Sequence, residues 1–294
     1  PQHIMRWPSP WSDGFPGWHL ECTAMSTKYL GNQFDIHGGG MDLKFPHHEN
    51  EIAQNVGSCN CAGAQYWLHT NMLLMNGKKM SKSDGNTITP TELFTGDSPH
   101  ITKGYSPMVI RFFMLQSHYR STLDLTDDAL LAAEKGYKRL MEGNKVLAEL
   151  TGASATAETA LDKEINELID GAFAEMNDDF NTPKALARLF ELVSKINSLK
   201  GGQLSMAELS ASTLERLKET FRVFIFDILG LMDEEGAASG NNEALDKAME
   251  LILDIRQDAR ANKDWGTSDK IRDALQAAGI VVKDGKDGTS WSVE

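Results

Sequence analysis

The sequence predicts an α/β fold in its N-terminal part, followed by an α-helical bundle and a small α/β tail. Residues 1–125 mix Gly, Pro, aromatic residues and short apolar runs, which is typical of strands and loops around a few helices. From there to residue 235, long segments rich in Ala, Leu, Glu and Lys contain few Gly or Pro. Residues 243–294 combine helical periodicity with a short apolar run. We therefore expect domains at 1–125, 126–235 and 243–294.

In the N-terminal part, apolar periodicity and Gly or Pro punctuation set the expected order of elements. The expected helices are 18–30, 47–55 and 109–117, and the expected strands are 34–36 and 67–75. Trp18, Cys22 and Met25 recur at three- and four-residue steps in the first helix. Pro46 is placed to open the second helix near its first turn.

The bundle is expected from four segments of helical periodicity, which are 127–150, 160–180, 183–199 and 214–231. Thr182 and Pro183 mark a helix start, with Thr as the N-cap and Pro in the first helical position. Residues 234–242 are acidic and rich in Gly, Ala and Ser, which indicates a linker. The elements expected beyond it are helices 243–262 and 267–278 and a strand 279–283.

The composition limits the class of protein. Apolar residues make up 41% and charged residues 24%, which fits a soluble globular protein, and no apolar run is long enough to span a bilayer. The net charge of −13 argues against a protein that coats nucleic acid, although a basic stripe on an acidic body is compatible with it. Cys22, Cys59 and Cys61 are too few for a disulfide framework, so we expect a reducing, cytoplasmic compartment. The chain begins at Pro1 without an initiator Met, so we expect a piece of a longer protein.

A metal site is suggested by His47 and Glu51, which lie four residues apart on a predicted helix and project from one face. Imidazole and carboxylate in that relation form half of a zinc site, and Cys22 on the other predicted helix would add a thiolate. The alternative is a helix-cap histidine and a small buried cysteine. Cys59 and Cys61 are a rival pair, but their spacing is shorter than in zinc knuckles, so we expect loop thiols.

A phosphate loop is suggested by residues 77–83, where three lysines and two serines occupy a turn-forming segment. Ammonium groups and hydroxyls there would hold a triphosphate and stabilise the charge of departing pyrophosphate. An ordinary basic surface loop is the alternative. Residues 37–42 place three glycines before Asp42, which would let the backbone approach a ligand while the acid accepts from ribose hydroxyls.

Together these motifs make the chain resemble the cysteinyl-tRNA synthetases, a family of class I aminoacyl-tRNA synthetases. The matching segments are Pro16–Cys22, Gly38–Leu43, Phe45–Glu51, Lys79–Ser83, His118–Ser121, Asp179–Pro183 and Ala259–Trp291. The resemblance implies a Rossmann-like catalytic domain whose C-terminal part is present here, then a DALR-like bundle and an anticodon-binding tail. It also implies that the enzyme ligates cysteine to tRNA(Cys) through cysteinyl adenylate, with ATP and Mg²⁺ as partners, and works as a monomer.

The resemblance further implies the roles of individual residues. Cys22, His47 and Glu51 would hold Zn²⁺, and Trp18, which spacing alone leaves as a core residue or a pocket wall, would line the cysteine pocket. The nucleotide would be bound by His37, Gly39, Asp42, Lys79, Ser81 and Lys82, of which Lys79 and Lys82 are the catalytic pair. Because a thiolate binds zinc far better than a hydroxyl, coordination of the substrate sulfur would reject serine without editing.

The tail concentrates Lys and Arg in an otherwise acidic chain, which is the electrostatic footprint of RNA contact. Trp265 is available to stack an unpaired base, and Asp269 and Asp284 could accept from a guanine edge. A solvated amphipathic helix with Trp265 in its core is the alternative. The resemblance implies that Arg260, Trp265, Asp269 and Asp284 read the anticodon.

The family's first zinc cysteine and its His-Ile-Gly-His-type ATP motif would both precede Pro1. We therefore expect three protein ligands for zinc, half of an ATP site, and no adenylate formation by this chain alone. Two other functions are compatible with the motifs: a ligase that joins cysteine to an amino sugar, and a non-catalytic tRNA-binding paralogue. The basic tail argues against the first, and the intact motifs argue against the second.

Overall fold

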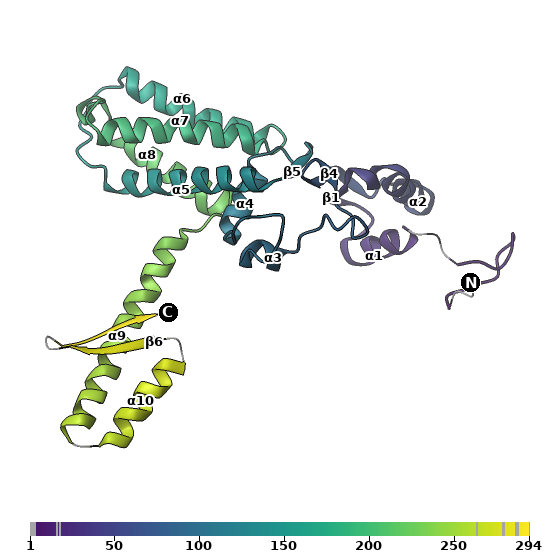
Figure 1. The fold of residues 1–294 in the computed structure, drawn as a ribbon. Coiled ribbons are helices and arrows are strands. Elements are labelled where there is room, and N and C mark those ends of the chain that lie inside the picture. Colours follow the sequence, from purple (N-terminus) through teal and green to yellow (C-terminus); the bar gives the residue numbers. More distant parts are fainter. Residues whose placement is uncertain are drawn as a thin grey trace. The chain divides into compact units, whose positions relative to one another are not determined.

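The computed structural model describes residues 4–15, 17, 19–262, 264–277, 280–285 and 288–293. The chain divides into two compact units, Pro1–Leu231 and Met232–Glu294. The first unit contains two small sheets and a helical bundle, and the second contains two helices and a hairpin (Figure 1).

The first sheet pairs β1 (Phe34–Gly40) with β2 (Ala64–Thr70) in parallel, from Phe34 opposite Ala64 to Gly40 opposite Thr70. The helix α1 (Leu20–Leu30) precedes this sheet, and α2 (Glu49–Cys59) makes the crossover between its strands. The strand β1 runs through the glycines beyond residue 36, where we expected it to end. A side chain at Gly39 would place its Cβ 2.9 Å from Cε1 of His48, so the glycine allows that imidazole to pack against the strand.

The helix that we expected to open at Pro46 begins later. Residues Met41–Leu43 form a 3-10 turn, Lys44–His48 form a π-helical turn, and α2 starts at Glu49. Phe45 has extended backbone angles inside this segment, which interrupts the helical path and delays the regular helix. His47 therefore lies in the turn before α2.

The second sheet has three short strands in the order β4, β3, β5. Here β3 (Leu73–Met75) pairs antiparallel with β4 (Lys78–Lys79) and parallel with β5 (Leu123–Leu125). The single strand expected over 67–75 is thus divided between two sheets. The break lies at Asn71, whose backbone N–H donates to the carbonyl of Tyr119 instead of a strand neighbour. Two helices, α3 (Pro90–Thr95) and α4 (Pro107–Leu115), lie between β4 and β5 in the sequence.

The bundle is made of α5 (Asp127–Glu149), α6 (Ala160–Asn177), α7 (Thr182–Lys200) and α8 (Ala211–Arg222), the last continuing as a π-helical segment, Val223–Ile228. Helix α7 packs against both α5 and α6 (Figure 1). The cap of α7 is Asn181, whose side chain accepts from the N–H of Lys184, so the predicted Thr182 cap was one residue late. Helix α6 ends before the predicted residue 180, because Asp179 and Phe180 adopt left-handed backbone angles, with φ of 59° and 53°.

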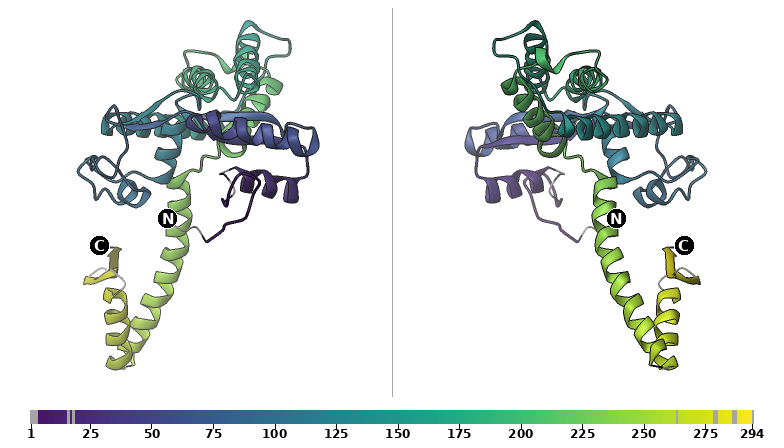
Figure 2. Two further views of the ribbon diagram at one scale, coloured as in Figure 1. Left: turned by 90° about the vertical axis from the view of Figure 1, so that its right-hand side faces the viewer. Right: turned by 90° about the vertical axis from the view of Figure 1, so that its left-hand side faces the viewer.

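In the second unit, α9 (Glu234–Ala261) packs against α10 (Trp265–Ala277), which in turn contacts the hairpin of β6 (Ile280–Gly285) and β7 (Gly288–Val293) (Figure 2). The prediction of a linker over residues 234–242 was wrong, since α9 includes these residues. Its alanines favour helix and it holds no proline, so its two glycines only weaken the helix. No helix in the described ranges is long and apolar enough to cross a membrane.

A buried carboxylate joins two helices of the bundle, α6 and α8. Asp162 is 1% exposed and accepts hydrogen bonds from Thr159, which caps α6, and from Ser210, which caps α8. Burial by itself would raise the pKa of Asp162. Hydrogen bonds from Ser210, Thr213 and Thr159 outweigh that effect and hold the pKa well below its usual range.

Replacement of Asp162 by Asn should lower the free energy of unfolding by about 2–4 kcal/mol at pH 7, since charge-assisted hydrogen bonds are lost and buried donors are left unsatisfied. Because the folded-state pKa is depressed, the contribution of Asp162 is full above pH of about 4 and is lost as the pH falls through the folded-state pKa. Urea unfolding of both proteins across this pH range measures it. The exposed Asp170→Asn is the control, with at most about 1 kcal/mol expected, and equal losses at the two positions would contradict the role of Asp162.

Close approach of α5 to α7 depends on Gly143. A Cβ there would lie 2.7 Å from Cγ2 of Val193, a stiff branched side chain at 0% exposure. We expect Gly143→Ala to destabilise the protein by about 1–3 kcal/mol, despite the better helix propensity of Ala. Gly57, in α2, has nothing within 4 Å of the same position, so Gly57→Ala should stabilise by roughly 0.5–1 kcal/mol. Urea unfolding measures the change in stability of both variants. A change in the same direction for Gly143→Ala and Gly57→Ala would contradict this packing argument.

Candidate functional site

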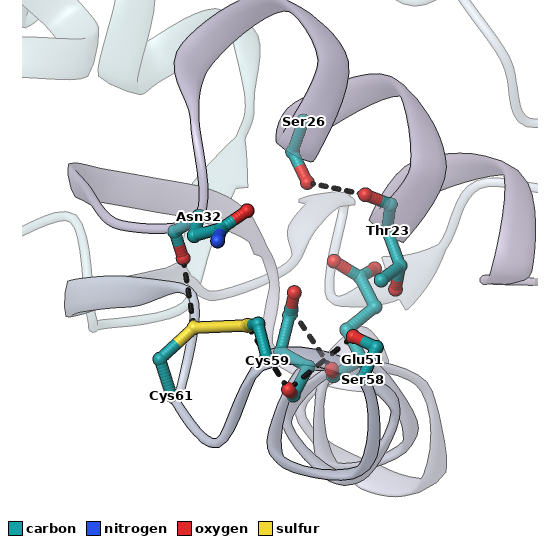
Figure 3. The surroundings of a disulfide bond; sticks show 8 residues. Thr23, Ser26, Asn32, Glu51, Ser58, Cys59 and Cys61 are labelled. Atoms are coloured by element: carbon teal, nitrogen blue, oxygen red, sulfur yellow. Dashed lines mark hydrogen bonds between the residues drawn. A yellow bond between two sulfur atoms is a disulfide. The ribbon is translucent and has the colours of Figure 1, made fainter.

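Two helices, the turn before the second of them and the middle of one strand bring imidazole, thiol and carboxylate groups together. Helix α1 packs beside α2, and the Thr23 hydroxyl donates to Gln54 Oε1 at 2.7 Å. Figure 3 shows Glu51 pointing from α2 toward Thr23 of α1. Glu51 is 5% exposed, so its carboxylate requires polar partners inside the protein.

One set of potential metal ligands consists of His19, Cys22 and Glu51, whose ligand atoms all lie within 4.8 Å of one another. His19 Nδ1 is 3.6 Å from Glu51 Oε1, and both residues are buried. Burial, and then the nearby Glu51 carboxylate, raise the pKa of the Cys22 thiol. A bound cation would reverse this preference, because it stabilises the thiolate.

His47 lies beside this set. Its Nδ1 is 2.5 Å from Nε2 of His19, and the two rings have their centroids 4.5 Å apart. His47 itself is in neither of the two ligand groups that the described residues form. The sequence analysis selected His47 and missed His19. His19 precedes Cys22 by three residues, so the two side chains fall on the same face at the start of α1.

The second set shares the same carboxylate. His37, His48 and Glu51 form it, with His37 Nε2 3.0 Å from Glu51 Oε2. His48 Nδ1 lies 2.9 Å from His69 Nε2, and the His37 ring meets Trp67 edge-on. Burial, followed by the neighbouring histidines His37 and His69, lowers the pKa of His48 to about 4. His37, which we expected at the nucleotide, therefore directs its ring toward Glu51.

The lysine loop follows β4 and is held by a residue that sequence reasoning treated only as part of a turn. Asn86 Oδ1 accepts from the N–H of Ser81 at 2.8 Å, and its Nδ2 donates to the carbonyl of Lys79 at 2.9 Å. The Ser81 and Ser83 hydroxyls lie 2.7 Å apart. Lys79 and Lys82 are exposed. The loop thus presents two ammonium groups on a backbone closed by Asn86.

The remaining predicted residues are spread over both units. Asp42 is exposed in the turn after β1, and Gly39 is part of that strand. Trp18 lies outside the described residues.

In the second unit, Arg260 is at the end of α9 and Trp265, 58% exposed, begins α10. Asp269 pairs with Arg272 at 3.0 Å. Asp284 belongs to β6, and its side chain lies outside the described part. Asp264 accepts from the N–H and hydroxyl of Thr267 and so secures the start of α10 beside Trp265.

Cys59 and Cys61, which we expected as loop thiols, are joined by a disulfide at the end of α2 (Figure 3). The chain turns back at Asn60, whose φ of 56° brings the two sulfurs together. The Cys61 Sγ lies 2.9 Å from the carbonyl oxygen of Asn32, in the loop after α1. The pair is therefore not an alternative ligand set in this structure, and Cys22 is the free cysteine.

Three family models match successive parts of the chain. The model for the tRNA synthetases class I (C) catalytic domain matches residues 2–135, and a DALR domain model matches residues 173–233. The Cysteinyl-tRNA ligase anticodon binding domain model matches residues 242–291.

Curated relatives agree with this. A cysteine–tRNA ligase of Parabacteroides distasonis is 54% identical over 294 residues, which is 100% of this chain and 58% of the relative. Those of Porphyromonas gingivalis and Deinococcus radiodurans are 52% and 45% identical, again over 58% and 57% of their lengths. A solved LeuRS–tRNA complex from Agrobacterium radiobacter K84 has a TM-score of 0.48 at 18% identity over 76% of this chain and 34% of that one, which is too distant to support an argument. The chain spans 58% of the length of the first relatives, and it belongs to the cysteine–tRNA ligase family of class I tRNA synthetases.

Proposed function

We propose that this chain takes part in the ATP-dependent ligation of cysteine to tRNA(Cys) through cysteinyl adenylate. The observation that carries the proposal is the cluster of His19, Cys22 and Glu51, with ligand atoms within 4.8 Å, on a chain that is 54% identical to a cysteine–tRNA ligase. Residues 1–125 would supply the catalytic part, 126–235 the DALR-like bundle and 243–294 the anticodon-binding part.

The donor set suits Zn²⁺. Thiolate, imidazole and carboxylate are the ligands that zinc takes in proteins, and the partly buried Cys22 beside two buried groups would exclude most water. Cys22, His47 and Glu51 are the proposed ligands, and the contact between His47 and His19 supports a role for His19 in orienting or replacing the His47 imidazole. When bound, the metal would coordinate the thiolate of substrate cysteine.

Selection of cysteine would follow from this donor set. Serine differs from cysteine by one atom, and an apolar pocket separates such near-isosteres poorly. Zinc prefers a thiolate to a hydroxyl by a wide margin. We propose that Trp18 forms one wall of the pocket. The buried Glu51 would fix the positions of His19 and His37, which contact its two carboxylate oxygens.

The nucleotide would bind at the glycine-rich end of β1 and the lysine loop. Gly39, with His37, would let the backbone approach the ligand, and Asp42 would accept hydrogen bonds from the ribose. Lys79, Ser81 and Lys82 would orient the triphosphate, with Mg²⁺, and stabilise the departing pyrophosphate. Asn86 supports this, since its side chain bonds to the backbone of both Lys79 and Ser81 and so fixes the start of the loop.

The tail would read the anticodon of tRNA(Cys) with Arg260, Trp265, Asp269 and Asp284. Its support is the exposed Trp265 ring at a helix start fixed by Asp264. We further propose a monomer in the cytoplasm. A ligase acting on an amino sugar is less favoured, since residues 242–291 match an anticodon-binding model.

Replacement of Cys22 by Ser should remove most of the bound zinc, because a hydroxyl is a far poorer ligand than a thiolate. Elemental analysis of the purified chain should find about one zinc per chain in the unaltered protein. Titration of the zinc-loaded chain should show binding of cysteine but not of serine.

The double variant Cys59→Ser/Cys61→Ser is the matched control, since it removes two sulfurs from the other end of α2. It should retain zinc and cysteine binding. Equal zinc in the Cys22→Ser variant and the unaltered chain would refute the proposed site.

Replacement of Trp265 by Ala should weaken binding of tRNA(Cys) by about 5- to 100-fold, as expected from the loss of one base-stacking contact. Filter binding or fluorescence anisotropy measures this affinity. Leu251→Ala removes a comparably exposed apolar side chain from the same unit and should have little effect. A similar loss for a tRNA with an altered anticodon would show that Trp265 does not read the anticodon.

A further inference from the structure

The lysine loop has a further attachment, at the turn that follows Ser83. The carbonyl of Gly85 accepts a hydrogen bond from Nε2 of His100 at 3.2 Å. Because a carbonyl can only accept, His100 carries a proton on Nε2. Asn86 bonds to the backbone at the start of the loop, whereas His100 holds its far end from a later part of the chain.

His100 lies in a segment whose two ends touch each other. Residues 96–104 follow α3, and the segment begins and ends with a glycine. A side chain on Gly104 would collide with the carbonyl oxygen of Phe94, and one on Gly96 would collide with the backbone of Gly104. The two glycines therefore allow a close backbone approach that closes the base of the segment.

The bundle anchors the second half of this segment. Thr102 donates from its N–H and from its hydroxyl to the two carboxylate oxygens of Asp127, at 3.1 and 2.8 Å. Asp127 is the first residue of α5. Lys103 Nζ lies 2.6 Å from Oε2 of Glu134, further along the same helix. The residues that follow His100 are thus bonded to α5 at two positions.

The backbone that carries the imidazole is also fixed. The N–H of His100 donates to the hydroxyl of Ser98 at 3.4 Å. The next side chain, Ile101, is 8% exposed and packs into the hydrophobic core. Because its backbone is already ordered, His100 loses only side-chain freedom when it bonds to Gly85.

We propose that His100 is a positioning residue for the lysine loop, which it tethers through Gly85 to a segment anchored on the bundle. Lys82 lies between the backbone held by Asn86 and the carbonyl held by His100, so both contacts limit the movement of its ammonium group. The benefit for a triphosphate rests on the proposed function, since a loop that is ordered in advance loses less entropy on binding. The tether itself does not depend on that function.

Tryptic cleavage after Lys82 tests the tether on this chain. Cleavage requires local opening of the loop, so its rate follows the open population when opening and closing are fast. His100→Ala removes the imidazole and should speed this cleavage about 2- to 10-fold, as expected for the loss of one hydrogen bond. Mass spectrometry of the fragments assigns each cut to its site.

Two further variants and an internal reference separate positioning from folding. His100→Gln retains an N–H donor near the end of the side chain, so it should be cleaved at close to the unaltered rate. Asp97→Asn changes an exposed residue of the same segment and should also leave the rate unchanged. Cleavage after Lys195, within α7, requires the bundle to unfold and should proceed equally in every variant.

Equal cleavage after Lys82 in the His100→Ala variant and the unaltered chain would overturn the tether. Cleavage of His100→Gln as fast as that of His100→Ala would also overturn it, since the hydrogen bond would then have no part in holding the loop. A parallel rise in cleavage after Lys195 would overturn it by assigning the effect to global stability.

A separate arm with Mg²⁺ and ATP distinguishes this inference from the proposed function. The nucleotide should slow cleavage after Lys82 in the unaltered chain, because phosphates would hold the loop closed. Absence of this protection would overturn the proposed role of the loop in binding ATP. The tether is judged by the cleavage rates without nucleotide, so the two failures are distinguishable.

Discussion

The carboxylate of Glu51 is the group around which the site is arranged. It is 5% exposed, and a buried carboxylate is stable only when its oxygens have partners. His19, at the start of α1, meets one oxygen at 3.6 Å, and His37, in β1, meets the other at 3.0 Å. One side chain of α2 therefore fixes the approach of a helix and a strand from two other parts of the chain. The two sets of potential ligands share it for this reason.

A second buried carboxylate organises the bundle in a comparable way. Asp162 links the caps of α6 and α8, while Asp179 reaches from the next loop to Arg120 beside the parallel strands. The bundle thus supports the ends of the parallel strands and also supplies a residue, Asp179, beside them. These contacts lie within the first compact unit, so the strand ends and the bundle form one structural body.

Local patterns predicted the long helices well. The segment expected over 127–150 is α5, Asp127–Glu149, because its apolar period repeats over many turns and Thr126 supplies a cap. Prediction failed where tertiary contacts override local preference. Residues 67–75 read as one strand, yet Asn71 bonds to Tyr119 and splits it, and residues 234–242 read as a linker although they continue α9. Cys59 and Cys61 were expected as separate thiols, because spacing alone does not reveal the turn at Asn60.

The sequence by itself determined the class of the site: a thiol, an imidazole and a carboxylate near a glycine run and a lysine loop. The tertiary structure decided which histidines meet Glu51. It brought His19 next to His47, placed His37 against Glu51, and paired His48 with His69. It also joined Arg120 to Asp179, which are far apart in the chain. Periodicity records neighbours within a few residues, whereas these contacts depend on how strands and helices pack, and no local pattern encodes that packing.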